Sequence, residues 1–184
     1  RIALIGHNGA GKSTLFLLLS GLQPSWSGEV YLHGQLIRPQ ERVSLRQQVA
    51  LVLQNSNYQL FTPSVEDEIA FGLKNMGLRE AELHERLEEL LTRYNLAELR
   101  HKPPHELSEG QKKWVALVAV LATDPEVLIL DEPTAALDAL YTERVLDLLE
   151  QLHLAGKTII ISTHDMELAS RFADRVLQIG RAHV

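Results

Sequence analysis

A pattern typical of phosphate binding lies near the start of the chain. The motif G-x-x-x-x-G-K-[ST] is matched by Gly6, His7, Asn8, Gly9, Ala10, Gly11, Lys12, Ser13 and Thr14. The glycines let backbone N–H groups close around phosphate oxygens, and the N-terminus of the helix that follows adds a favourable dipole. We expect Lys12 to reach the β- and γ-phosphates of ATP and the Ser13 hydroxyl to bind Mg²⁺. The alternative is an ordinary glycine-rich turn.

Two adjacent carboxylates follow an apolar run further along the chain. Residues 127–130 are Val-Leu-Ile-Leu, and Asp131 and Glu132 come directly after them. A buried strand ending in Asp131 would place its carboxylate where it can hold the Mg²⁺ shell of a phosphate-transfer site. Glu132 could then orient and partly deprotonate the attacking water, which a carboxylate committed to the metal cannot do. The alternative is a strand that merely ends in an acidic, proline-containing turn.

A second group combines a helix start with features that suit an anion. It consists of Ser108, Glu109, Gly110 and Gln111. The spacing S-x-x-Q is a capping box, which by itself only begins a helix. A helix start with a Ser hydroxyl, a Gly backbone and N–H groups can also bind an anion. Because this chain already has a phosphate site around Lys12, we expect this helix start to serve a second nucleotide presented by another subunit.

The elements that must position these residues follow an α/β pattern. Strand patterns occupy residues 2–5, 49–53, 127–131, 158–162 and 176–179, with helical patterns at 12–20, 138–154 and 166–173. Strands that alternate with helices predict a parallel sheet. Residues 29–33 also alternate, as an exposed strand does. The strand at 49–53 would deliver Gln54 to a sheet edge.

The middle of the chain changes to a helical period. Ser64 can cap a helix that reaches about residue 73, and leucines at 83, 87, 90 and 91 share one face of a second helix. We therefore predict an α/β fold of the P-loop NTPase (RecA-like) type, with a parallel-sheet core and a helical insertion. The single domain would have its core at residues 1–63 and 124–184 and its helical subdomain at about 64–123.

Composition narrows the classes of function. The 184 residues are 45% hydrophobic and 23% charged, as in ordinary globular proteins. The formal net charge of −6 argues against a general nucleic-acid binder, which needs Lys and Arg to neutralise phosphates. There is no cysteine, so disulfides and Cys-based metal sites are excluded. The apolar runs fall well short of the ~20 residues that span a bilayer, so a membrane role would be peripheral or through a partner.

Both ends of the sequence are expected to be truncated. Arg1 enters a predicted strand without an initiating Met, so we expect an upstream segment. The last six residues, Ile-Gly-Arg-Ala-His-Val, translate back to the DNA of a common sequencing adapter. We therefore expect the natural chain to differ after Leu177. The alternative is a genuine short tail, which is common at domain ends.

Together these motifs resemble the ATPase subunit of an ATP-binding cassette (ABC) transporter, and the resemblance runs nearly end to end. Residues 6–14 resemble its phosphate loop, 107–111 its signature, and 131–132 its magnesium and catalytic-base positions. The resemblance also implies roles for three further residues. Gln54 resembles the glutamine-loop residue near ATP and Mg²⁺, Asp138 belongs to a D-loop at 136–138, and His164 resembles the switch histidine. A lone His after a strand is more often incidental, but the preceding run at 159–163 favours the switch role.

The family implies ATP and Mg²⁺ as cofactors and a head-to-tail dimer with a second ABC ATPase subunit. Each ATP would lie between the phosphate loop of one subunit and the signature of the other. Two positions depart from the family pattern. Glu109 replaces a usual glycine of the signature, and Trp114 stands where an arginine is common. Neither change removes a phosphate ligand, so we expect activity.

A narrower resemblance covers residues 54–55, 59–61, 63–72 and 75–78. These segments are similar to the ATPases of energy-coupling-factor importers, especially the cobalt and nickel branch. This implies integral-membrane transport subunits as partners, a peripheral place on the cytoplasmic face of the membrane, and no nucleic acid. The cargo would be a small solute, either a cobalt or nickel ion or a vitamin. The surface around Gln54, Gln59, Leu60 and Phe61 is expected to receive a partner helix, with Leu60 and Phe61 at the rim of its socket. The alternative for this apolar pair is core packing.

Two other functional classes stay open at this point. One is the ATPase of another ABC transporter class, an exporter or amino-acid importer, which the segment at 59–72 disfavours. The other is a soluble cassette protein that acts on DNA or ribosomes. Such proteins usually carry tandem cassettes, long insertions or basic surfaces, and this sequence has none of these.

Overall fold

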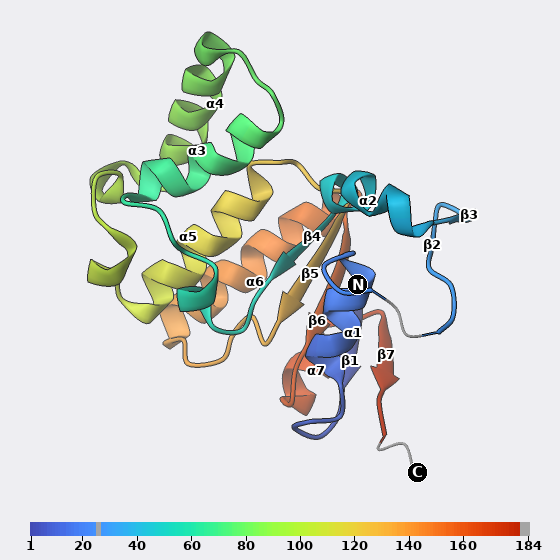
Figure 1. Cartoon of the computed structure of the whole chain (residues 1–184). Coiled ribbons are helices and arrows are strands. Elements are labelled where there is room, and N and C mark those ends of the chain that lie inside the picture. The colour runs from blue at the N-terminus through green and yellow to red at the C-terminus, as the bar shows by residue number, and fades with distance from the viewer. Residues whose placement is uncertain (25–26, 181–184) are drawn as a thin grey trace. The chain divides into compact units, whose positions relative to one another are not determined.

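The structure is a computed structural model that describes residues 1–24 and 27–180 (Figure 1). The chain forms two compact units. The first contains residues 1–51, 125–133 and 148–184, and the second contains residues 52–124 and 134–147. The helical subdomain predicted at about 64–123 falls inside the second unit. Residues 181–184, the last part of the adapter-like tail, lie outside the described residues.

The first unit is built on a five-stranded sheet. Its strands are β1 (Ile2–Ile5), β4 (Val49–Val52), β5 (Val127–Asp131), β6 (Thr158–Ser162) and β7 (Arg175–Gln178), in the order β4-β5-β6-β1-β7. The pairs β5–β6, β6–β1 and β1–β7 are parallel. The register places Asp131 opposite Ser162. The parallel-sheet core that the sequence predicts is therefore confirmed.

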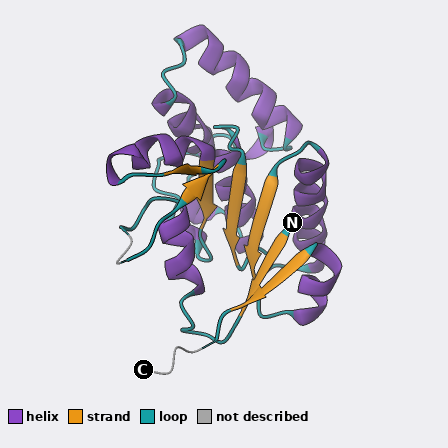
Figure 2. Ribbon diagram, turned by 90° about the vertical axis from the view of Figure 1, so that its right-hand side faces the viewer, coloured by secondary structure: helices purple, strands orange, loops and turns teal. Residues whose placement is uncertain are grey.

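Helices flank these strands on both sides (Figure 2). Helix α1 (Lys12–Leu19) contacts β5, and α7 (Met166–Phe172) contacts β1. Helix α2 (Arg42–Gln48), preceded by the 3-10 turn η1 (Pro39–Glu41), was not predicted. Burial of apolar side chains between α1, α2 and the sheet supplies the stabilising core. Its buried members are Leu4, Phe16, Leu45, Val49 and Ile129.

One predicted strand is wrong in its bounds. Residues 29–33 were expected to form a single exposed strand, but the structure has a short antiparallel hairpin of β2 (Tyr31–Leu32) and β3 (Gln35–Leu36). The turn consists of His33 and Gly34, whose φ angles are +51° and +74°. Two consecutive residues with positive φ form the tight turn that suits a two-residue hairpin loop. The strand therefore reverses at His33.

The second unit is mostly helical. It contains α3 (Val65–Asn75), α4 (Glu80–Arg93), α5 (Glu109–Leu121) and the start of α6 (Ala139–Leu154), with 3-10 turns η2 (Ser56–Tyr58), η3 (Ala97–Leu99) and η4 (Pro104–Glu106). Ser64 caps α3 as expected, because its side chain accepts the Asp67 N–H. Helices α3 and α5 pack together, and fully buried leucines and isoleucines fill the interior, among them Ile69, Leu73, Leu90, Leu91 and Leu117.

Within the described residues, no helix combines the length and apolar character needed to cross a membrane.

Candidate functional site

The phosphate loop connects the end of β1 to the start of α1. Gly9 and Gly11 have φ angles of +77° and +98°, a region that costs glycine little and other residues much more. Lys12 is 7% exposed, and its Nζ donates to the carbonyl oxygens of Gly6 at 2.8 Å and His7 at 3.2 Å. The ammonium group therefore lies inside the curve of the loop. This is the position from which a lysine can contact phosphates held by the loop.

Two oxygen ligands suited to a hard cation lie beside the loop. The Ser13 hydroxyl, on the first turn of α1, donates to Asp131 Oδ2 at 2.5 Å. Asp131 is the last residue of β5 and is 6% exposed. A hydroxyl and a carboxylate in contact are a partial ligand set for Mg²⁺, which takes few protein ligands and uses substrate phosphates and waters for the rest.

Ser162 supports both carboxylates and was missed by the sequence analysis. It ends β6, is fully buried, and donates its hydroxyl hydrogen to Asp131 Oδ1. The same hydroxyl accepts the Glu132 N–H at 2.9 Å. The signal that could have identified it is the register of two parallel strands, since equal strand lengths place residues 131 and 162 side by side. Ser162 thus fixes the Asp131 carboxylate and the backbone that carries Glu132.

Glu132 and His164 come together at the carboxyl ends of β5 and β6. Glu132 Oε2 lies 2.9 Å from His164 Nδ1. The glutamate is 7% exposed, whereas the histidine side chain is 71% exposed. Glu132 has a φ angle of +48°, an uncommon conformation for a residue with a side chain and one often associated with functional sites. The structure thus groups the predicted phosphate loop, Asp131, Glu132 and His164 within the first unit.

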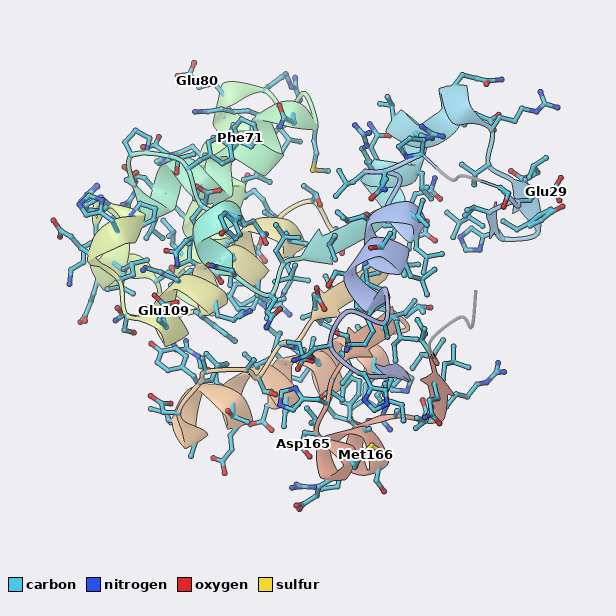
Figure 3. The ribbon with its side chains drawn as sticks, turned by 60° about the horizontal axis from the view of Figure 1, so that its bottom comes forward. Glu29, Phe71, Glu80, Glu109, Asp165 and Met166 are labelled. Carbon is cyan, nitrogen blue, oxygen red and sulfur yellow. The ribbon has the colours of Figure 1, made fainter. Side chains whose placement is uncertain are left out.

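The predicted signature residues form the start of α5 in the second unit. Ser108 Oγ accepts the Gln111 N–H at 3.2 Å, and Gln111 Oε1 accepts the Ser108 N–H at 3.0 Å. This is the complete capping box that the spacing predicts. The Glu109 side chain is 59% exposed (Figure 3). It pairs with Lys112 at 2.8 Å. The carboxylate that replaces the usual glycine therefore lies on the surface of this unit, partnered by a cation.

Gln54 also belongs to the second unit, where it is exposed and follows β4. The buried Lys113 of α5 donates from Nζ to the carbonyl oxygens of Leu53, at 3.2 Å, and Gln54. Gln59 binds the same segment, because its Oε1 accepts the Leu53 N–H at 3.0 Å and its Nε2 donates to the Ala116 carbonyl at 3.3 Å. The segment that carries Gln54 is thereby tied to the signature helix. The roles of Gln54 toward ATP and Mg²⁺ stay a prediction.

Asp138 precedes α6 in the second unit and caps that helix. Its Oδ1 accepts the Tyr141 N–H at 2.8 Å. A side-chain acceptor at this position satisfies an N–H that has no partner within the helix. The predicted D-loop residue thus has a local structural role, and its role toward a nucleotide stays a prediction.

The expected socket rim requires a correction at Leu60. Leu60 was expected at the surface beside Phe61, but it is only 9% exposed, whereas Phe61 is 68% exposed. Phe61 packs edge to face against Phe71, with ring centroids 5.0 Å apart, and Phe71 is itself 45% exposed. Leu60 comes shortly after the 3-10 turn η2, and its backbone N–H donates to the carbonyl oxygen of Ser56 at 3.0 Å. The exposed apolar surface is therefore formed by Phe61 and Phe71, which we call the aromatic pair.

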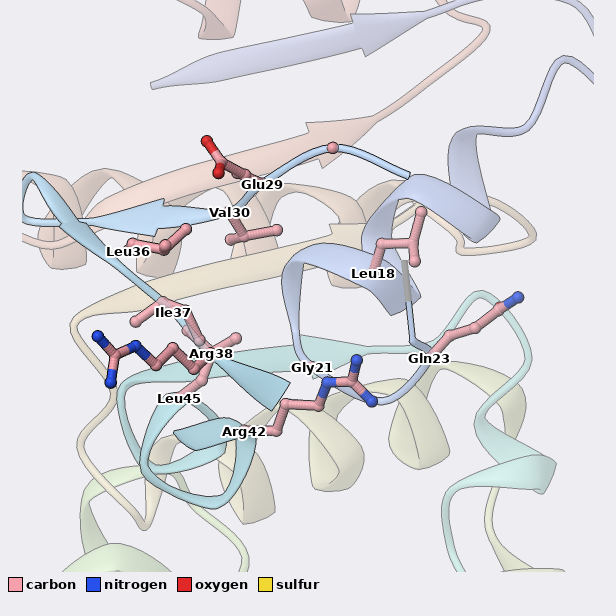
Figure 4. Close-up of a pocket in the computed structure, with 11 residues that line it drawn as sticks. Leu18, Gly21, Gln23, Glu29, Val30, Leu36, Ile37, Arg38, Arg42 and Leu45 are labelled. Carbon is pink, nitrogen blue, oxygen red and sulfur yellow. The ribbon is translucent and has the colours of Figure 1, made fainter. Parts of the chain in front are cut away.

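A cavity of about 210 Å³ lies elsewhere in the first unit, between the β2–β3 hairpin, α1 and α2 (Figure 4). Its walls include Leu18, Ile37, Leu45 and the stems of Arg38 and Arg42. None of the predicted site residues lines it. The cavity is therefore separate from the candidate site at the phosphate loop.

Comparison with known proteins finds a matching family and close relatives of this chain. The ABC transporter family model matches residues 1–135. The energy-coupling factor transporter ATP-binding protein EcfA of Methanocaldococcus jannaschii is 45% identical over 177 residues. The cobalt import ATP-binding protein CbiO of Rhodobacter capsulatus is 48% identical over 177 residues. Each alignment covers 95% of this chain, and the chain spans 63% of the length of each relative.

A solved structure shares the fold. The structure of cbiO1 from Clostridium perfringens, described as part of the ABC transporter complex cbiONQ, superposes with a TM-score of 0.84 at 40% identity. The match covers 97% of this chain and 72% of that one. The predicted P-loop NTPase fold is confirmed, as is the similarity to the ATPases of energy-coupling-factor and cobalt importers.

Proposed function

This chain belongs to the ABC transporter family, and we propose that it is the ATP-binding and ATP-hydrolysing subunit of an energy-coupling-factor importer. It would energise the uptake of a small solute, either a cobalt or nickel ion or a vitamin, through integral-membrane partners. The observation that carries the proposal is the contact of Ser13 with Asp131 and of Glu132 with His164 beside the phosphate loop. The names of the EcfA and CbiO relatives support the importer class.

The loop residues would hold the triphosphate of ATP. Lys12 Nζ already has two carbonyl partners within the loop, and anionic phosphate oxygens would add ion pairs that are stronger than these bonds to neutral carbonyls. The backbone N–H groups before α1 and the dipole of that helix act on the same phosphates. These contacts to the phosphates all come from residues of the first unit.

The pair of Ser13 and Asp131 fits Mg²⁺ by the chemistry of its donors. Both groups are hard oxygen ligands, and the described residues contain no group of three or more His, Cys, Asp or Glu that would favour a different metal. Gln54 is proposed as a further ligand. Mg²⁺ bound there would neutralise charge on the β- and γ-phosphates.

Glu132 is proposed as the general base. It follows Asp131 directly, so its carboxylate can approach a water near the γ-phosphate while Asp131 is committed to the metal. Two contacts limit the positions that this carboxylate can take. Glu132 Oε2 contacts His164 Nδ1, and the backbone N–H of Glu132 donates to the Ser162 hydroxyl. His164 is proposed to hold Glu132 in the orientation that activates water.

The signature residues are proposed to act on the ATP of a second subunit. Ser108, Gly110 and Gln111 lie at a capped helix start in the second unit, whereas the loop, Asp131 and Glu132 all lie in the first. A head-to-tail dimer would bring the helix start of one chain to the phosphates held by the other. The dipole of α5 would then favour the negative charge of the γ-phosphate.

The aromatic pair is proposed to contact a helix of a membrane subunit at the cytoplasmic face. Two exposed aromatic rings in edge-to-face contact form an anchor of the kind found in protein interfaces. The segment that links them to Gln54 is tied to α5 by Lys113 and Gln59. Docking at this surface would therefore act on both the glutamine loop and the signature helix.

An uptake assay tests the proposal. The chain is co-expressed with the membrane subunits of an energy-coupling-factor importer, and uptake of labelled nickel or cobalt is measured together with ATP hydrolysis. Phe61→Asp should abolish uptake while basal hydrolysis persists, because it places an unpaired charge in the contact. The matched control is Leu154→Asp, which changes a side chain that is 77% exposed on α6. Parental uptake and assembly by Phe61→Asp would contradict the docking role. Absence of ATP hydrolysis in the parent would contradict the function itself.

A further inference from the structure

Tyr141 packs directly against the second residue of the signature helix in the same chain. A Cβ added to Gly110 would lie 2.6 Å from Cδ2, 2.8 Å from Cγ and 3.0 Å from Cε2 of the Tyr141 ring. Nonbonded carbon atoms attract best at about 3.5–4.0 Å, so there is no room for a methyl group at this point. Both residues belong to the second unit. Packing within the chain therefore requires a glycine at position 110.

The backbone of Tyr141 is tied to the D-loop. Tyr141 lies in the first turn of α6, and its N–H donates to Asp138 Oδ1 at 2.8 Å. The backbone of Tyr141 is thus bonded to Asp138 while its ring contacts Gly110. A displacement of the start of α6 would be transmitted through this ring to the start of α5.

Arg144, three residues further along α6, makes a second connection to α5. Its guanidinium lies 4.1 Å from the centroid of the Trp114 ring, and its Nη2 donates to the Tyr94 carbonyl at 2.7 Å. The Trp114 Nε1–H donates to the same carbonyl at 3.0 Å. Trp114 is only 4% exposed and Arg144 is partly buried, so the guanidinium lies against a buried ring.

The two connections lie on one face of α6, because residues three apart are neighbours on a helix surface. Tyr141 contacts the first turn of α5, and Arg144 contacts that helix one turn later, at Trp114. The orientation of α5 relative to α6 is therefore fixed at two points. Trp114, which departs from the family pattern, is one of these two points.

We propose that Tyr141 and Arg144 are positioning residues that clamp the signature helix to the D-loop helix, so that the signature and D-loop of one chain move as a single piece. Neither residue belongs to the predicted ATP-binding set. The consequence for catalysis rests on the proposed function, in which both elements meet the ATP of the partner. The clamp itself is a contact inside one chain and can be tested without a partner.

The test is suppression of Gly110→Ala by Tyr141→Ala in the full chain. In a helix alanine is normally more favourable than glycine, so destabilisation by Gly110→Ala would report the clash with Tyr141 rather than helix propensity. We expect Gly110→Ala to lower both the melting temperature and, by about tenfold or more, the kcat for ATP hydrolysis. The double variant should match Tyr141→Ala alone in both the melting temperature and kcat.

Three single variants complete the experiment. Tyr141→Phe keeps the ring and should match the parent, whereas Tyr141→Ala should reduce kcat about tenfold with the affinity for ATP within about twofold of the parental value. Arg144→Met should behave as Tyr141→Ala does. The control is Glu143→Ala, an exposed residue of the same helix, which should match the parent in all three measurements.

Each result has a definite meaning. A double variant as unstable as Gly110→Ala would contradict the contact between Gly110 and Tyr141. A double variant as stable as Tyr141→Ala but with a kcat well below that of Tyr141→Ala would contradict the positioning role, because Gly110 would then be needed for another reason, such as close approach to phosphate. A parent that does not hydrolyse ATP would refute the proposed function, and the melting temperatures would still decide the clamp.

Discussion

Removal of the Ser162 hydroxyl should damage the candidate site although Ser162 is not expected to touch ATP. The side chain is fully buried, and its Oγ serves both Asp131 Oδ1 and the Glu132 N–H. A hydrogen bond to a charged group contributes about 1.5–3 kcal/mol, and a buried donor left unpaired costs about 1–3 kcal/mol. Ser13 still donates to Asp131 in the variant. We therefore expect Ser162→Ala to lower the free energy of unfolding by about 3 kcal/mol, near the lower end of the combined range.

Thermal unfolding is the first assay for this variant. For a chain of this size, 1 kcal/mol corresponds to about 2–4 °C, so the melting temperature should fall by about 6–12 °C. The control is Ser44→Ala, which changes an exposed serine of α2 and should alter stability by no more than about 0.5 kcal/mol.

The second assay is the Mg²⁺ dependence of ATP hydrolysis. Without Ser162 the Asp131 carboxylate is held less firmly, so half-maximal activity should require a higher Mg²⁺ concentration. A Ser162→Ala variant with the parental melting temperature and the parental Mg²⁺ dependence would refute the argument from the two hydrogen bonds.

Three further predictions follow from other contacts. Lys12→Ala should weaken ATP binding by about tenfold to a hundredfold, because it removes a charged donor to the phosphates; unchanged binding in calorimetry would contradict that role. A mixed dimer with Lys12→Ala in one subunit and Ser108→Ala in the other should keep one intact ATP site if the signature acts across the dimer. Loss of both sites, measured as binding stoichiometry alongside turnover, would contradict the trans arrangement. Glu68→Ala should lower the free energy of unfolding by at least about 2 kcal/mol, because the buried carboxylate accepts from two backbone N–H groups and one hydroxyl. The control Glu80→Ala changes an exposed residue and should leave stability unchanged. Equal melting temperatures for the two variants would contradict the importance of this buried network.

The central strands β5 and β6 were predictable because most of their residues are buried. Such strands appear in the sequence as short continuous apolar runs, and the observed bounds of β5 and β6 are those expected. The phosphate loop was predictable because its conformation needs glycine at fixed positions, which the φ angles of Gly9 and Gly11 illustrate.

The features that were missed depend on tertiary contacts. Helix α2 buries only Leu45, so its sequence has almost no amphipathic period. Leu60 and Phe61 are adjacent and both apolar, and only the packing around η2 decides which of them is exposed. Ser162 ends an apolar run in the same way as many strand residues do. Its importance emerges only when the parallel register places it beside Asp131.

The clamp on the signature helix also could not be derived from the sequence. The glycine at position 110 is expected for a signature, so it gives no indication of the tyrosine 31 residues later. Trp114 was noticed as a departure from the family pattern without an explanation. The structure supplies one, because the ring lies under Arg144 and donates to Tyr94.

The central claim is that Glu132 activates water for hydrolysis of bound ATP. The most direct test compares Glu132→Gln with the parent in ATP affinity and in hydrolysis rate, both measured on the same preparation. Glutamine keeps the size of the side chain and its ability to bond His164, but it cannot accept a proton at neutral pH. We predict ATP affinity close to that of the parent and a hydrolysis rate lower by about 10²–10⁴-fold, with Glu126→Gln, an exposed glutamate beside β5, at the parental rate. Hydrolysis by Glu132→Gln at the parental rate would contradict the assignment of the base.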